Sequence, residues 1–244
     1  LTMRIVQLTD LHIGLENEDT YGVDVRQNFL QILDKAKAQR PDLLVISGDL
    51  CYRDGDARIY AWIKHHLDES GLPYEVMSGN HDDPVLLARA FGREGLLKGK
   101  ELYFSREYAD RTVLFLDTTT YEMPAKQMEW LSEALKAIKG PALVFMHHPP
   151  LPGGVPFMDS KHSLRNMEAV QAVFFEHPHP VQVFTGHYHV EKIVTKRNLT
   201  VYITPSCFFQ IGQRSEDFEV DHYRVALRTI DWSNGMMMNA VHYL

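Results

Sequence analysis

Side chains that can bind metal ions stand at the ends of five short apolar runs in this sequence. They are Asp10, Asp49, Asn80, His147 and His187. Two of them are followed by a second donor two positions later, because His12 follows Asp10 and His189 follows His187. If the apolar runs are strands of an α/β fold, their carboxyl ends form the edge at which such folds bind ligands. We therefore expect these seven side chains to meet in one site.

The composition of this donor set favours two metal ions. A catalytic zinc ion takes about three protein ligands and a water molecule, so seven side chains exceed the need of one ion. Histidine nitrogens mixed with carboxylate and amide oxygens suit iron, manganese, zinc or cobalt better than calcium or magnesium. Two neighbouring ions need a bridging ligand. We expect Asp49 in this role, because the preceding Gly48 permits close approach of the backbone.

A single Asp or His after a strand usually serves as a turn or capping residue. The prediction of a metal site therefore depends on the conjunction of five strand ends. The remaining candidates lack such a pattern. We expect Cys51 and Cys207 to be buried thiols, His65 and His66 to be solvated helix residues, and His148 to support the site without binding metal.

Alternating strand and helix patterns position the candidate ligands. Strands that end at these ligands are predicted at 3–8, 43–46, 74–77, 142–146 and 181–184. Apolar residues at helical spacing predict helices over 25–39, 57–68, 125–138 and 165–175. Asp24 and Asp56 are the expected N-caps of the first two helices.

The rest of the chain favours β-structure. Further strands are predicted at 102–105, 113–117, 192–195, 200–203, 223–230 and 236–242. The turn sequence Ser233-Asn234-Gly235 predicts a hairpin between the last two strands. Neither a repeat nor a linker interrupts the pattern. We therefore expect one α/β domain with mixed sheets over 1–244, which includes a C-terminal β-hairpin region at 200–244.

Composition limits the classes of partner. The chain has 244 residues, of which 45% are hydrophobic and 23% charged, as in ordinary globular proteins. Its net charge of −7 argues against nucleic acid or an anionic membrane as a partner. The apolar runs are too short to cross a bilayer, the chain opens without a signal-peptide pattern, and two cysteines suit a reducing compartment. We expect a cytoplasmic protein, with monomer and homo-oligomer both open.

The strand-end residues stand in the pattern of the calcineurin-like metallophosphoesterases, which the chain resembles over residues 3–205. The matching motifs are Asp10-Leu11-His12, Gly48-Asp49, Gly79-Asn80-His81-Asp82, His147 and Gly186-His187-Tyr188-His189. The resemblance implies a four-layer αββα sandwich with two mixed β-sheets. It also implies two sets of metal ligands. One set is Asp10, His12, Asp49 and His189, and the other is Asp49, Asn80, His147 and His187.

Within this family, the chain resembles the class III cyclic-nucleotide phosphodiesterases and the related glycerophosphodiesterases. The residues that carry this likeness are Tyr21-Gly22-Val23-Asp24, Gly79-Asn80-His81-Asp82-Asp83 and Met146-His147-His148-Pro149-Pro150. The stretch from Thr204 to His242 is similar to the tail of bacterial cyclic AMP phosphodiesterases. It departs from that tail between Asp221 and Tyr223, where a few residues including Pro-Gly are missing.

The resemblance implies hydrolysis of a phosphodiester, with 3′,5′-cyclic AMP to 5′-AMP as the first expectation. The alternatives are a glycerophosphodiesterase or a broad-specificity phosphodiesterase. A metal-free scaffold without catalysis is less favoured, because all seven donors are present. A hydroxide that bridges two metal ions would attack phosphorus in line, which makes Asp49 a catalytic residue as well as a ligand. His81 is the candidate to protonate the leaving group, or else to hydrogen-bond the phosphate. Asp82 is expected either to orient His81 or to cap the next helix.

Overall fold

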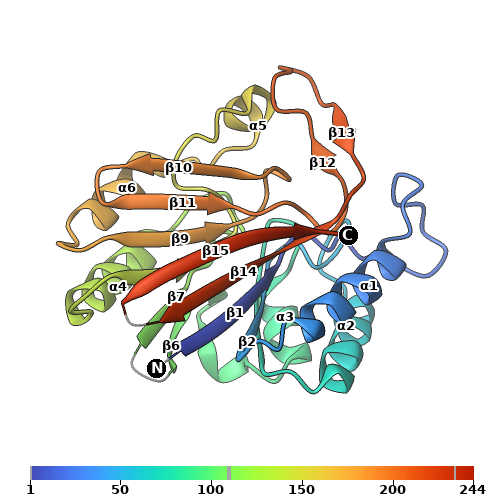
Figure 1. Cartoon of the computed structure of the whole chain (residues 1–244), viewed down its shortest axis with the longest axis horizontal. Helices are drawn as coiled ribbons and strands as arrows, with labels where there is room; N and C mark the ends of the chain where they lie inside the picture. Colours follow the sequence, from blue (N-terminus) through green and yellow to red (C-terminus); the bar gives the residue numbers. More distant parts are fainter. Residues whose placement is uncertain (1, 109–110, 234) are drawn as a thin grey trace.

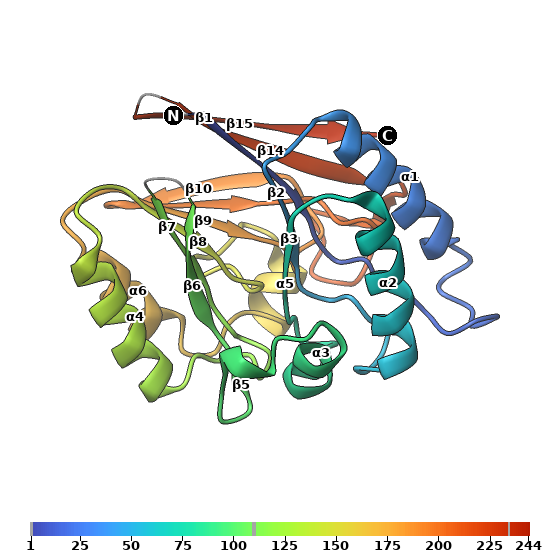
Figure 2. The same ribbon diagram turned by 90° about the horizontal axis from the view of Figure 1, so that it is seen from below.

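Two mixed β-sheets lie face to face, and helices cover both outer faces (Figure 1, Figure 2). The computed structural model describes residues 2–108, 111–233 and 235–244. Its helices are α1 (Val25–Ala38), α2 (Ala57–Ser70), α3 (Pro84–Ala90), α4 (Ala125–Ala137), α5 (Pro156–Lys161), α6 (Met167–Phe175) and the short 3-10 helix η1 (Glu94–Leu96). Helices α1 and α2 lie outside one sheet, and α4 and α6 lie outside the other (Figure 2). This arrangement confirms the expected four-layer sandwich.

The first sheet has five strands in the order β15-β14-β1-β2-β3. They are β1 (Thr2–Leu8), β2 (Leu43–Ser47), β3 (Tyr74–Met77), β14 (Ala226–Ser233) and β15 (Met236–Tyr243). The strands β1, β2 and β3 run parallel. Strand β14 lies antiparallel to β1, and β15 lies antiparallel to β14 at the edge of the sheet. The predicted C-terminal hairpin is confirmed by the pairing of Ser233 with Met236, although Asn234 of its turn lies outside the described residues.

The second sheet has six strands in the order β10-β11-β9-β8-β7-β6. They are β6 (Phe104–Tyr108), β7 (Arg111–Phe115), β8 (Ala142–Phe145), β9 (Val181–Thr185), β10 (Lys192–Lys196) and β11 (Leu199–Ile203). Its four central strands are parallel and its two edge strands antiparallel. Two small ladders complete the chain, β4 (Leu97–Lys98) with β5 (Glu101–Leu102) and β12 (Gln210–Ile211) with β13 (Val220–His222).

The apolar runs form strands because they are buried on both sides. All five residues of β2 and all four of β8 are buried, as is typical of parallel strands between two layers. Aromatic rings on neighbouring strands of the second sheet form a continuous ladder. Its ring centroids are 4.7 Å apart for Phe104–Phe115, 5.6 Å for Phe115–Phe145, 5.6 Å for Phe145–Phe184 and 4.7 Å for Phe184–Tyr202. These contacts stabilise the strand order.

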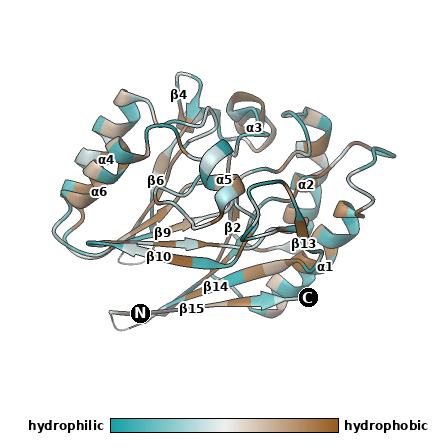
Figure 3. Ribbon diagram, turned by 90° about the horizontal axis from the view of Figure 1, so that it is seen from above, coloured by the Kyte–Doolittle hydropathy of each residue, from teal (hydrophilic) through white to brown (hydrophobic). Residues whose placement is uncertain are grey.

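The covering helices are amphipathic and begin where their caps predict. The side chain of Asp24 accepts a hydrogen bond from the Gln27 backbone, and Asp56 accepts one from the Arg58 backbone. Both predicted N-caps are therefore confirmed. Helices α1, α2 and α4 carry hydrophobic as well as hydrophilic residues, as expected for helices with one buried face (Figure 3).

Several predicted boundaries were wrong. Helix α2 continues to Ser70 and ends at Gly71, whose φ of 69° suits a left-handed cap. The predicted helix 165–175 begins only at Met167, because the Asn166 side chain bonds both backbone groups of Met123. The predicted strand pair 102–105 and 113–117 lies at β6 and β7, and β14 begins at Ala226 rather than 223. The short helices α3 and α5 were not predicted.

A buried polar network joins the two sheets behind the carboxyl ends of their parallel strands. Gln7 of β1 donates to the Ser47 hydroxyl at 2.8 Å and to the Thr185 carbonyl at 3.2 Å. The Thr204 hydroxyl donates to Gln7 at 2.7 Å and accepts from Arg228 Nε at 2.8 Å. The network fixes one sheet against the other next to the loops that carry the candidate ligands.

Candidate metal centre

The loops after five parallel strands bring the predicted ligands to one end of the sandwich. Asp10 follows β1, Asp49 follows β2 and Asn80 follows β3, while His147 follows β8 and His187 follows β9. Both sheets therefore contribute side chains to the same place, as the rule for carboxyl ends predicts. Among the described residues at this place, three groups of three have ligand atoms within 4.8 Å of one another, and two of these groups consist only of predicted ligands.

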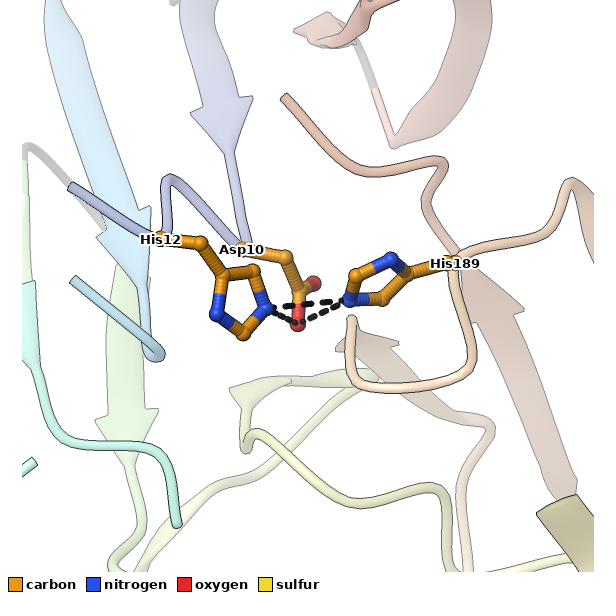
Figure 4. Close-up of side chains that lie close together, drawn as sticks. All are labelled: Asp10, His12 and His189. Atoms are coloured by element: carbon orange, nitrogen blue, oxygen red, sulfur yellow. Dashed lines mark hydrogen bonds and ion pairs between the residues drawn. The ribbon is translucent and has the colours of Figure 1, made fainter. Parts of the chain in front are cut away.

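The first group is Asp10, His12 and His189 (Figure 4). His12 Nε2 lies 3.2 Å from His189 Nε2, and Asp10 Oδ1 lies 3.3 Å from His189 Nε2 and 3.9 Å from His12 Nε2. Two imidazole nitrogens and a carboxylate oxygen thus converge on one point. This is a donor set that suits zinc, iron or manganese.

The second group is Asp49, His147 and His187. His147 Nε2 lies 3.2 Å from Asp49 Oδ2. Asp49 Oδ2 also lies 3.7 Å from His12 Nε2, a member of the first group. The carboxylate of Asp49 therefore reaches both groups, as a bridging ligand would. Asp10 Oδ1 also lies 3.7 Å from His147 Nε2, so both carboxylates stand near the boundary between the groups.

Three of the predicted ligands have a buried polar atom without a hydrogen-bond partner among the described residues. These atoms are His12 Nδ1, Asn80 Oδ1 and His147 Nε2. A buried polar atom without a partner loses solvation without compensation, at a cost of about 1–3 kcal/mol each. A cation in the site would satisfy Asn80 Oδ1 and His147 Nε2, so the donors present fit a metal centre.

Hydrogen bonds on the outer ring nitrogens orient the imidazoles. His147 Nδ1 donates to the Ser47 carbonyl at 2.9 Å, and His189 Nδ1 donates to the Phe209 carbonyl at 2.8 Å. Both rings therefore direct Nε2 into the site. His187 is held the other way round, because its Nε2 donates to the His162 carbonyl at 2.8 Å, which leaves Nδ1 for a metal.

The backbone at the predicted ligands is strained. Five of the seven have positive φ angles, at 54° for Asp10, 46° for His12, 50° for Asp49, 65° for His187 and 50° for His189. Residues other than glycine seldom adopt this region, and it recurs at functional sites. The strained loops turn the side chains toward one another immediately after each strand.

Position 79, beside the predicted ligands, has no room for a side chain larger than that of glycine. A Cβ atom on Gly79 would lie 2.8 Å from His147 Nε2 and would collide with the carboxylate of Asp49. Gly79 therefore makes room for the side chains of predicted ligands.

Burial and charge set the protonation of the site. Burial lowers the pKa of His12 and that of His187 to about 3, so both are neutral at pH 7, the form that binds metal. Burial also lowers the pKa of His147, but Asp49 and Asp10 outweigh it and raise that pKa to about 9. For Asp49, His147 in turn overcomes the effect of burial and holds the pKa of the carboxyl well below its usual value. His189 and His147 likewise outweigh burial and hold the pKa of the Asp10 carboxyl below its usual value. The two ionised carboxylates therefore attract positive charge to the centre of the site.

His81 lies beside both groups. Its Nδ1 contacts the Arg53 carbonyl at 2.7 Å, and its backbone N–H donates to Asp49 at 2.9 Å. One ring nitrogen lies within 4.8 Å of ligand atoms of His12 and Asp49. His81 is therefore close enough to act on a group bound at the site.

Both expectations for Asp82 were wrong. Its buried carboxylate accepts hydrogen bonds from the backbone of Leu50, Cys51 and Gly79 at 2.9–3.2 Å and from the Tyr60 hydroxyl at 3.0 Å. It thus ties the loop of Asp49 to the loop of Asn80. The cap of α3 is Asp83, which accepts from two backbone N–H groups of that helix.

Cys51 and Cys207 are buried free thiols, as expected. His65 is exposed on α2 as predicted. His66 was predicted to be solvated, but it is half-buried, because its ring packs 4.4 Å from the Trp62 ring. His148 is buried next to His187, with ring centroids 4.2 Å apart, and its Nδ1 lies 2.7 Å from the Thr118 hydroxyl.

A cavity of about 360 Å³ opens at the metal centre. It is lined by His12, Asp49, Asn80, His81, His187 and His189, and also by residues that the sequence did not single out for the site, among them Tyr121, His162 and several Phe side chains. These additional residues come from separate loops and share no local motif. None of the described residues that line the cavity is a Lys or an Arg.

Comparison with known proteins identifies the family. Residues 3–191 match the model of the calcineurin-like phosphoesterases. The chain belongs to this family. The two ions predicted for the donor set agree with a family whose members use two metal ions, and the prediction of a metal-dependent phosphodiesterase is confirmed. None of the helices in the described ranges is long and apolar enough to span a membrane.

Relatives cover almost the whole chain. A probable cyclic nucleotide phosphodiesterase of Fibrobacter succinogenes is 31% identical over 99% of this chain and 94% of its own. The 3′,5′-cyclic adenosine monophosphate phosphodiesterase CpdA of Escherichia coli is 27% identical over 99% and 90%. The glycerophosphodiester phosphodiesterase GpdQ of Enterobacter lignolyticus is 28% identical over 88% and 81%. A dimetal phosphatase from Danio rerio shares the fold, with a TM-score of 0.70 at 15% identity over 98% of both chains.

Proposed function

We propose that this chain hydrolyses 3′,5′-cyclic AMP to 5′-AMP. The observation that carries the proposal is one cavity that combines members of both candidate metal groups with aromatic side chains. Such a cavity accommodates a phosphate and a planar base at the same time. The names of the relatives from Fibrobacter succinogenes and Escherichia coli support cyclic nucleotides as the substrate class.

We assign the ligands as the family resemblance implies. One ion is held by Asp10, His12, Asp49 and His189, and the other by Asp49, Asn80, His147 and His187. The close approach within each group and the reach of Asp49 to both groups support this assignment. The unpaired Oδ1 of Asn80 supports its inclusion. Under this proposal residues 1–244 act as one domain, and β14–β15 complete its first sheet.

When bound, the two ions supply an activated water for attack on phosphorus and positive charge for the phosphate oxygens. The residues of the chain perform the remaining tasks. Asp49 fixes the spacing of the two groups. His81 gives a proton from Nε2 to the leaving 3′ oxygen, since the Arg53 carbonyl occupies its Nδ1.

The charge of the cavity favours a diester over a monoester. A phosphodiester carries one negative charge and a phosphate monoester close to two at neutral pH. Without a Lys or Arg among the described lining residues, the ions alone must balance the substrate. A monoanionic substrate suits that balance better.

A glycerophosphodiester is the second candidate substrate, and the relative from Enterobacter lignolyticus favours it.

The free thiols of Cys51 and Cys207 suit a reducing compartment, so we place the enzyme in the cytoplasm.

A turnover panel tests the proposal. Cyclic AMP, glycerophosphocholine and bis-p-nitrophenyl phosphate are each offered to protein loaded with manganese, iron, zinc or cobalt. We expect cyclic AMP to give 5′-AMP, with loss of activity in chelator. Turnover of glycerophosphocholine without turnover of cyclic AMP would favour the second candidate.

A further inference from the structure

Four aromatic side chains from distant parts of the sequence form one side of the cavity. We call Tyr21, Phe208, Phe209 and Phe218 the aromatic wall. Ring centroids are 4.1 Å apart for Phe208–Phe209, 5.5 Å for Tyr21–Phe209, 5.8 Å for Phe209–Phe218 and 6.1 Å for Tyr21–Phe218. All four rings therefore belong to one continuous cluster.

The wall begins at the metal centre. The Phe208 ring lies 5.1 Å from the His12 ring, and the Phe209 ring lies 5.3 Å from the His189 ring. The Phe209 carbonyl also accepts the hydrogen bond that orients His189. A substituent on a phosphate bound at the ligands is therefore within reach of the wall.

The rings at the rim of the cavity remain open to a ligand. Phe208 and Phe209 are only 2% and 5% exposed, whereas Tyr21 is 57% and Phe218 is 42% exposed. Two large aromatic rings thus present apolar surface at the mouth of a cavity, where burial by a ligand would be favourable. Tyr21 is held there by a loop in which its own φ is 55°, an unfavourable angle for a bulky residue.

We propose that the aromatic wall is a base-binding subsite, in which a nucleobase stacks on Tyr21 and Phe218. Stacking of a base on aromatic side chains is strong and needs no matching hydrogen bonds. A glycerol or choline substituent has no flat π-face and gains less from the same rings. This inference deepens the proposed function, because it takes the bound phosphodiester as the anchor of the base.

The test compares the double variant Tyr21→Ala/Phe218→Ala with wild type. We expect the KM for cyclic AMP to rise at least about tenfold with kcat little changed, since loss of base stacking costs about a factor of ten or more. The kinetics with glycerophosphocholine should change by less than about twofold. An unchanged KM for cyclic AMP, or an equal rise for both diesters, would overturn the proposal.

Tyr223→Ala is the matched control, because Tyr223 is 59% exposed and does not line the cavity. It should leave both substrates unaffected. The single variant Tyr21→Phe, which leaves Phe218 unchanged, should retain the wild-type KM, because the ring face is kept. If Tyr21→Phe raises the KM as much as the double variant does, stacking is not the cause and the inference fails.

Calorimetry separates this inference from the proposed hydrolysis. Metal-loaded wild type should bind 5′-AMP at least about tenfold more tightly than ribose 5-phosphate, which lacks only the base, and the double variant should lose this difference. This result would support the base subsite even if no diester were hydrolysed. Equal affinities in wild type would overturn the subsite even in an active phosphodiesterase.

Discussion

The imidazole rings of His147, His189 and His187 are each held by a hydrogen bond on the ring nitrogen that faces away from the site. The acceptors are backbone carbonyls of Ser47, Phe209 and His162, which lie on different loops. Carbonyl acceptors keep a proton on the outer nitrogen and leave the inner lone pair for a cation. The site is therefore organised before any ion binds.

Under the proposed ligand assignment, both halves of the centre depend on Asp49. We expect Asp49→Ala to lose both metal ions and all turnover above the metal-free background, because a bridging carboxylate belongs to two coordination shells. Metal analysis of the purified variant measures this. Asp34→Ala, an exposed position on α1, is the control and should keep two ions. Two ions per chain in Asp49→Ala would contradict the bridge.

His81 should matter for rate and not for metal. Proton transfer by a positioned side chain contributes about 10²–10⁴-fold, so His81→Ala should lose that factor on cyclic AMP and retain both ions. The loss should be much smaller on bis-p-nitrophenyl phosphate, whose leaving group needs little protonation. Equal losses on the two substrates would argue for phosphate binding instead.

The loops that follow the strands contain glycines that cannot be replaced by larger residues without a steric clash. Gly79→Ala should lower the free energy of unfolding by about 1–3 kcal/mol and weaken metal binding, because the added Cβ collides with ligand side chains. Gly140→Ala is the matched control, since nothing lies within 4 Å of its Cβ position. Urea unfolding and metal titration measure the two effects. A Gly79→Ala variant as stable as the control, with normal metal affinity, would show that the loop is not constrained.

The strands that carry ligands were predictable because they are buried on both sides. Such strands appear in the sequence as short apolar runs, and β3 matches its predicted bounds at 74–77. The helices α3 and α5 have only seven and six residues, too few for a helical period to stand out. The direction of the Asp82 carboxylate depends on the Asp49 loop folded against it, and a local sequence pattern does not contain that information.

The candidate metal ligands could be predicted from the sequence, whereas the aromatic wall of the cavity could not. Five strand ends meet at one edge in any α/β sandwich, so the donors could be collected from the sequence. Tyr21, Phe208 and Phe218 come together only when the loop before α1, the segment after β11 and the stretch before β13 have all folded. Tertiary contacts of this kind leave no periodic signal.

The whole molecule depends on how its two sheets are joined. Arg228 is buried in β14, and its guanidinium donates to Thr204 Oγ1 at 2.8 Å, to the Ile203 carbonyl at 3.1 Å and to Asn239. Its carbonyl and hydroxyl partners belong to the second sheet and the segment that follows it. Burial lowers the pKa of Arg228 to about 10, so it remains charged at pH 7.

We expect Arg228→Ala to lower the free energy of unfolding by about 3 kcal/mol, because several buried acceptors lose their donor. Arg228→Lys should not restore stability, since an ammonium group cannot reach three partners in one plane. Urea unfolding measures both, with the exposed Arg214→Ala as the control. A loss no larger than that of the control would mean that the network contributes little to joining the sheets.

The activity of the molecule should require both ions at once. The most direct test strips the wild-type protein with chelator and titrates manganese back while cyclic AMP turnover and bound metal are measured on the same samples. We predict little activity up to one ion per chain and a rise to full activity as the second binds, with 5′-AMP as the product. Full activity at one ion per chain, or two bound ions without turnover of cyclic AMP, would contradict the account.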